Sequence, residues 1–412
     1  MKKRWPMILA CLLFALVSGA PIQAQEVSLA QENSPAQNRG LSWNAALSTD
    51  LVYSYTDAAQ IIQADSWADF ANALGSGYYG GFTTLSLGFQ GGDRDSAQLV
   101  GLIKMLVPYG VAAAQLSQAG IPVPFGLDIS KLYVTLSFAK ADLSFGRMIV
   151  NYGKGRLFSP SDLFSAVNLQ DQALGRLGTD VLRLQIPLSD LAGLDFVGTL
   201  VLPPEKAVFG GRAFASLGSW DVSAMIFQNN GGLASLKAGM LTQALVPGGP
   251  AAASTEPSLI GSIDVKGNLV LGLYGEALMS IPYENYHLVP DRSSLSVVLG
   301  ADYSFGGTLF CALEYQGNFG TGSPVGQFKA DTSLFASLSW KLDDWTSTAG
   351  HLIYAPDIQA WQANVSLSRN LMRRTSLVVY TGASQGDVRS SGAQSGADNI
   401  SLALGLTLRA AF

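Results

Sequence analysis

The last thirteen residues, ISLALGLTLRAAF from Ile400 to Phe412, decide the fold class because they alternate between two kinds of side chain. Apolar residues fill every second position, and small or polar residues fill the positions between them. A period of two is the signature of a β-strand whose two faces meet different surroundings. A single strand of this kind also occurs in soluble proteins, so the rest of the chain has to show whether the pattern repeats.

The alternation does repeat along the chain, for example over 132–138, 295–303 and 334–341. Of all residues, 48% are hydrophobic and only 13% are charged, which is too few charges to cover the outside of a soluble barrel. After residue 20, no stretch approaches the roughly 18 consecutive apolar residues that a membrane-spanning helix requires. The sequence therefore predicts an all-β protein, a transmembrane antiparallel up-and-down β-barrel with an apolar outside and a wet interior.

The connections between the expected strands alternate between short and long when they are followed back from Phe412. Tight periplasmic turns and longer external loops alternate in this way in outer-membrane barrels. Residues 232–241 also have the character of a strand, but one more strand there would place the long loop 151–179 on the periplasmic side. We therefore assign 229–257 as one external loop. About 18 strands result, with 16 as the alternative: 41–55, 79–91, 95–106, 130–139, 142–150, 180–187, 193–202, 209–217, 219–228, 258–266, 269–279, 293–304, 308–317, 331–341, 345–354, 360–369, 373–382 and 398–412.

The N-terminus has the layout of a secretory signal peptide, with three basic residues followed by the apolar run Met7 to Val17. We expect cleavage after Ala24, a periplasmic tail over 25–40 and the barrel over 41–412. The signal carries 3 of the 25 basic residues, so 22 remain against 30 acidic residues and the mature net charge is −8. This charge argues against nucleic acid as a partner.

The densest group of charges falls over 151–183, which covers the predicted loop 151–179 and the start of the next predicted strand. Two interpretations remain open: a loop folded toward the pore, whose charges shape the constriction, and a structural loop pinned by Arg–Asp pairs to the barrel wall. Other charges occupy the polar positions of their strands, where they should face inward. The pore-lining and constriction candidates are Arg147, Lys154, Arg156, Asp162, Arg176, Asp180, Arg183, Asp264, Lys266, Glu276, Asp302, Glu314 and Lys341.

Two further loops, 56–78 and 107–129, are too apolar for ordinary solvated loops, and we expect them to pack at the barrel mouth or on one another. The sequence leaves open whether these loops and 151–179 narrow the lumen.

The chain resembles Gram-negative-type outer-membrane β-barrels over its whole length, through its signal peptide, its amphipathic strands and its terminal Phe412. The resemblance implies that the barrel-assembly machinery recognises the C-terminal strand through Phe412. Residues 145–164, with Asn151-Tyr152-Gly153-Lys154-Gly155-Arg156 at their centre, look like a segment of a porin-like group of mostly uncharacterised barrels, where tryptophan commonly replaces Tyr152.

Nothing in the sequence points to an enzyme, a metal site or a cofactor. The two histidines, His287 and His351, stand in no catalytic motif, and there are only two cysteines. We expect a porin-like channel for passive diffusion of small hydrophilic solutes, embedded in outer-membrane lipid and capable of forming homo-oligomers. The alternatives are a transporter of apolar substrates, such as fatty acids or hydrocarbons, and a surface-binding structural barrel.

Overall fold

The computed structural model describes residues 40–55, 77–93, 95–110, 113, 126–167, 175–201, 204–233, 256–285, 287–320, 329–386 and 400–412. The predicted signal peptide, nearly all of the predicted tail and most of loops 56–78 and 107–129 lie outside these residues. Among the described residues, no helix is long and apolar enough to cross a membrane.

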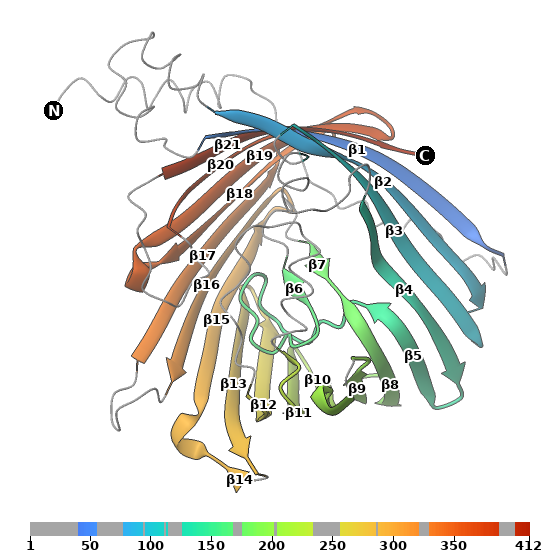
Figure 1. Cartoon of the computed structure of the whole chain (residues 1–412), viewed down its shortest axis with the longest axis vertical. Helices are drawn as coiled ribbons and strands as arrows, with labels where there is room; N and C mark the ends of the chain where they lie inside the picture. Colours follow the sequence, from blue (N-terminus) through green and yellow to red (C-terminus); the bar gives the residue numbers. More distant parts are fainter. Residues whose placement is uncertain are drawn as a thin grey trace.

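Within the described part of the chain, eighteen long strands form one closed antiparallel barrel (Figure 1). Each strand pairs with its neighbours along the chain, and β1 closes the barrel by pairing with β21, Ala46 opposite Ala411 and Tyr55 opposite Leu402. This confirms the all-β class and the count of 18 rather than 16. The strands are β1 Ser42–Tyr55, β2 Tyr78–Asp93, β3 Ala97–Gly110, β4 Gly126–Phe138, β5 Ala141–Met148, β8 Thr179–Ser189, β9 Ala192–Thr199, β10 Val208–Leu217, β11 Trp220–Asn229, β12 Ser258–Asn268, β13 Gly272–Glu284, β15 Ser294–Phe305, β16 Leu309–Gly320, β17 Lys329–Lys341, β18 Thr346–Ala355, β19 Ala360–Met372, β20 Thr375–Gln385 and β21 Ile400–Ala411.

In the described ranges, three short strands and three 3₁₀ turns lie outside the barrel wall. β14 (His287–Leu288) extends the hairpin after β13, while β6 (Ala166–Val167) and β7 (Arg176–Leu177) pair within the long connection between β5 and β8. The 3₁₀ turns span Pro204–Lys206, Pro290–Arg292 and Pro356–Ile358. β11 pairs directly with β12, and most of the predicted external loop 229–257 lies outside the described residues.

Short turns gather at one end of the barrel together with both ends of the strand sequence, and the long connections gather at the other end. We refer to these as the turn end and the loop end. β3 and β4 reach further toward the loop end than expected, to Gly110 and from Gly126, so part of the predicted loop 107–129 is strand.

The outer face of the wall is apolar and exposed. Outward side chains such as Leu299, Leu313 and Ile263 are each about three-fifths exposed, because in this isolated chain nothing covers them. The intervening positions carry hydroxyl, amide and charged groups that face inward. A hydrocarbon solvent outside and water inside account for both faces, which is the arrangement of a transmembrane barrel.

Candidate functional site

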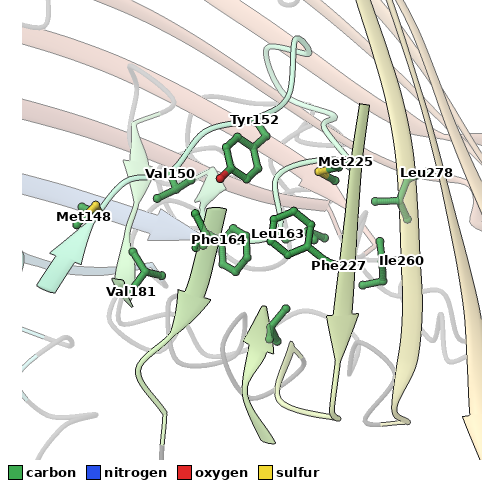
Figure 2. Close-up of a cluster of buried hydrophobic side chains, with 12 residues drawn as sticks. Met148, Val150, Tyr152, Leu163, Phe164, Val181, Met225, Phe227, Ile260 and Leu278 are labelled. Atoms are coloured by element: carbon green, nitrogen blue, oxygen red, sulfur yellow. The ribbon is translucent and has the colours of Figure 1, made fainter. Parts of the chain in front are cut away.

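The connection between β5 and β8 turns back into the barrel, and we call residues 149–165 the inner loop. Tyr152, Leu163 and Phe164 of this loop are buried, with at most 2% of each side chain exposed. They pack on inward-facing side chains of the wall, and Figure 2 shows Tyr152 and Phe164 beside Phe227 of β11. Phe164 and Phe227 meet edge to face, with 5.1 Å between ring centroids. Burying each such side chain stabilises the docked loop by roughly 1.5–3 kcal/mol.

The wall beneath the inner loop is apolar on its inward face, which differs from the polar lumen that the alternation predicted. The buried side chains come from successive strands from β8 to β13: Val181, Val197, Val208, Met225, Phe227, Ile260 and Leu278. These residues therefore form a small hydrophobic core inside the barrel, covered by the loop rather than by water.

Two glutamates of the wall hold the inner loop through its backbone. Glu314 on β16 accepts hydrogen bonds from the N–H groups of Arg156, Leu157 (3.0 Å) and Phe158 (2.8 Å). Glu276 on β13 accepts those of Lys154 and Gly155, the latter at 2.6 Å. The two glutamates are only 3% and 2% exposed, so the backbone donors replace the water that would otherwise solvate the carboxylates.

Asp162 closes the inner loop on itself. Its Oδ1 accepts the N–H groups of Tyr152 (2.7 Å) and Gly153 (3.0 Å), and its other oxygen pairs with Arg176. Seven consecutive N–H groups, from Tyr152 to Phe158, thus end on three carboxylates. Burial lowers the pKa of the Arg176 guanidinium and raises the pKa of the Tyr152 hydroxyl, to which the charge of Asp195 also contributes.

The two glycines of the inner loop are required for space. Neither has a positive φ. A Cβ on Gly153 would lie 1.4 Å from Ser159 Oγ, and one on Gly155 would lie 1.8 Å from the Phe158 carbonyl oxygen. The loop can double back onto Glu276 only because both positions lack a side chain.

Several other candidates form ion pairs on the inner wall. Arg183 on β8 pairs with the buried Asp195 on β9 at 2.5 Å, and Lys266 pairs with Asp302 at 3.2 Å. Asp264, whose side chain is 1% exposed, lies 3.8 Å from both Lys154 and Arg212. Lys341 pairs with Asp344 at the turn end, away from the inner loop.

Arg147 and Asp180 lie elsewhere. They are opposite each other in the β5–β8 ladder and form a hydrogen-bonded ion pair at 2.7 Å. Both stand on the same face as the exposed Phe145 and Leu182, so this pair is on the outer face near the loop end and not on the lumen side. The sequence accounts for this position, because residues two apart in a strand share a face and Arg147 follows the outward Phe145 by two residues.

The basic and acidic side chains around the inner loop are equal in number. With the Lys266–Asp302 pair, the contacts described above bring together six basic and six acidic side chains on the lumen side: Lys154, Arg156, Arg176, Arg183, Arg212 and Lys266 against Asp162, Asp195, Asp264, Glu276, Asp302 and Glu314. Arg156 alone of these six basic side chains is exposed, and its guanidinium lies over the Phe310 ring, 4.8 Å from the centroid. The guanidinium forms no ion pair with a carboxylate among the described residues.

Asp195, Arg212 and Tyr274 belong to this arrangement but were not candidates from sequence. Asp195 and Arg212 had a usable signal, since both are charged residues at inward positions of their strands. The hydroxyl of Tyr274 donates to Glu314 at 2.6 Å, and the sequence offered no sign of this role except that Tyr274 occupies an inward position of its strand.

The two histidines lie at separate places in the described part of the chain. His351 lies on the inner wall with its Nε2 2.9 Å from Asn364 Nδ2, and His287 is exposed in β14. Within the described ranges, His, Cys, Asp and Glu side chains form no group of three or more that could hold a metal ion.

Comparison with solved structures concerns the barrel as a whole. OccK5 (OpdH) of Pseudomonas aeruginosa matches 90% of this chain and 98% of its own, with a TM-score of 0.53 and 8% sequence identity. OccAB4 of Acinetobacter baumannii matches 92% and 100%, with a TM-score of 0.52 and 10% identity. OccK11 (OpdR) of Pseudomonas aeruginosa matches 90% and 96%, with a TM-score of 0.51 and 9% identity.

No protein-family model and no functionally described protein matches the sequence. At identities this low, the likeness to solved structures concerns the fold. The fold is that of a porin-like outer-membrane barrel, as the resemblance in the sequence predicted.

Proposed function

We propose that this protein is an outer-membrane channel for the passive diffusion of small hydrophilic solutes. The observation that supports it most is the inner loop, which is fixed inside a closed barrel of eighteen strands by wall carboxylates and a local hydrophobic core. Barrels of 16–18 strands enclose an aqueous channel. A loop fixed to one side of such a channel narrows it without the need for a separate plug.

In this proposal, the inner loop forms the constriction and Arg156 faces the diffusing solute. Arg183, Asp195, Lys266 and Asp302 line the wall as closed ion pairs, so they keep the lumen wet with little net field. No bond of the solute is made or broken, and no cofactor takes part.

The proposal also includes export through a signal peptide over 1–24 and insertion into the outer membrane through recognition of Phe412. Phe412 is 68% exposed, and its N–H donates to the Ala45 carbonyl at 2.8 Å. Its ring is therefore available to another protein while its backbone completes the barrel seam.

The test is single-channel conductance of the refolded full-length chain in planar bilayers. A heat-modifiable shift in gel mobility first establishes that the barrel is closed. Stepwise, stable openings in KCl are the expected result. A correctly folded barrel that conducts no ions would refute the diffusion channel. Binding of a fatty acid by that silent barrel would then support a transporter of apolar substrates instead.

A further inference from the structure

A polar pocket lies on the inner wall beside the root of the inner loop, formed by β3, β4, β5 and β8. It has a volume of 370 Å³ and is lined mainly by amide and hydroxyl side chains, with Met148 and Ile149 at its loop-end margin. This volume is within the range of small-molecule sites. The pocket is separate from the wall carboxylates that hold the inner loop.

The hydrogen-bonding groups of the pocket are largely free. Thr135 and Ser144 bond to each other at 2.8 Å, whereas the side chains of Gln98, Gln185 and Tyr133 make no hydrogen bond within the described part of the chain. Each amide offers donors and an acceptor, and the phenol offers one of each. A ligand that carries several hydroxyl groups, each both donor and acceptor, complements such a lining.

The charges of the pocket argue against an ionic ligand. Arg183, on β8 at one side of the pocket, already donates to Asp195 through Nε at 3.0 Å and through its terminal nitrogen at 2.5 Å. Lys131 and Asp142 remain, one of each sign. Asp142 pairs in register with Ser137, six residues along β4 from Lys131, which separates their Cα atoms by roughly 20 Å. An ion that binds beside Lys131 or Asp142 would therefore not contact the other of these two residues.

The width of the pocket also limits the ligand. Gln98 on β3 and Gln185 on β8 are three strand spacings apart, roughly 14 Å between backbones along the wall. Their side chains extend into the lumen from both margins, and Thr135 and Ser144 lie on the two strands between them, in register with Gln98. Two linked sugar rings fit between such margins better than a single small ion does.

We propose that this pocket is a weak binding site for neutral, polyhydroxylated solutes of mono- or disaccharide size. The inference rests on the proposed channel function and adds a substrate class to it. A weak site beside the constriction raises the local concentration of such solutes without trapping them.

The experiment is titration of single open channels with lactose and with its anionic relative lactobionate, using the full-length protein in bilayers. Binding of lactose in the pocket lowers the ion current in a saturable way, beyond the proportional fall that viscosity causes. The double variant Gln98→Leu/Gln185→Leu should weaken the lactose effect about tenfold or more, measured against its own current without sugar, since one neutral hydrogen bond is worth about fivefold.

The matched control is Gln362→Leu, which changes an inward-facing amide on β19 outside the pocket and should leave the lactose titration unchanged. A current that falls only in proportion to viscosity would overturn the proposed site while leaving the channel intact. Stronger blockade by lactobionate than by lactose would also overturn it, because the pocket would then be an anion site. Absence of any conductance would instead remove the channel function on which the inference rests.

Discussion

The attachment of the inner loop to Glu314 can be tested by a substitution that keeps the size and shape of the side chain. In Glu314→Gln, an amide NH₂ replaces one carboxylate oxygen, and the side chain loses its charge. The carboxylate accepts three backbone N–H groups and the Tyr274 hydroxyl, so the amide cannot accept all of them. If the amide oxygen keeps Leu157 and Phe158, the N–H of Arg156 faces another donor.

The expected loss of docking free energy is about 3 kcal/mol. Leaving one buried donor without an acceptor costs roughly 1–3 kcal/mol, and the two remaining bonds weaken when their acceptor becomes neutral. A loss of this size raises the population of the detached loop about 100-fold or more, since each 1.4 kcal/mol is tenfold.

Trypsin reports this population directly because it cleaves after Lys154 and Arg156, both inside the inner loop. We expect the folded Glu314→Gln barrel to be nicked at these sites about 100-fold faster than the wild type, while its heat-modifiable gel shift is retained. The matched control is Asp302→Asn, which neutralises an inward carboxylate paired with Lys266 and not in contact with the loop. Equal nicking rates in all three proteins would refute the proposed attachment.

Three other outcomes are expected. Gly153→Ala places a Cβ on Ser159 Oγ and should expose the inner loop to trypsin. Gly261→Ala, where a Cβ would have no heavy atom within 4 Å, should be cleaved at the wild-type rate. Faster cleavage of Gly261→Ala than of Gly153→Ala would contradict the need for a glycine at position 153. Arg156→Glu reverses the sign of the exposed charge at the constriction and should move the zero-current potential in a KCl gradient toward cation preference, and an unchanged potential would show that Arg156 does not face the ion path. Phe412→Ala removes a ring that is 68% exposed, so refolding in detergent should be unaffected while the folded fraction in cells falls; equal loss in both settings would indicate a packing role instead.

The strands of this protein could be predicted from sequence because the two solvents impose the period-two pattern on the wall. The segment expected at 258–266 is observed as Ser258–Asn268, and the C-terminal strand expected from 398 is observed from Ile400. The pattern weakens where protein replaces water inside the barrel. β11 has Ile226 outward and Phe227 inward, so near the loop end it is apolar on both faces. This double apolar character was the available signal for the buried core beneath the inner loop.

The roles of the wall glutamates could not be predicted in the same way. Their inward orientation follows from parity, but their partners are backbone N–H groups more than 100 residues away, and every residue except proline offers such a group. The partner of Arg183 depends on the β8–β9 register, which an irregularity between Pro187 and Ser189 shifts. Placement of Arg147 was open to sequence reasoning, since it lies two residues from the outward Phe145.

The long sequence separation of the loop contacts sets an order of events during folding. Gly155 precedes Glu276 by 121 residues, and Phe158 precedes Glu314 by 156 residues. Five N–H groups of the inner loop, from Lys154 to Phe158, have no acceptor until β13 and β16 have joined the sheet, and contacts this distant form late because much chain must first be ordered. A partly assembled barrel therefore carries an undocked loop with five solvated donors, and the proposed constriction forms only as assembly nears completion.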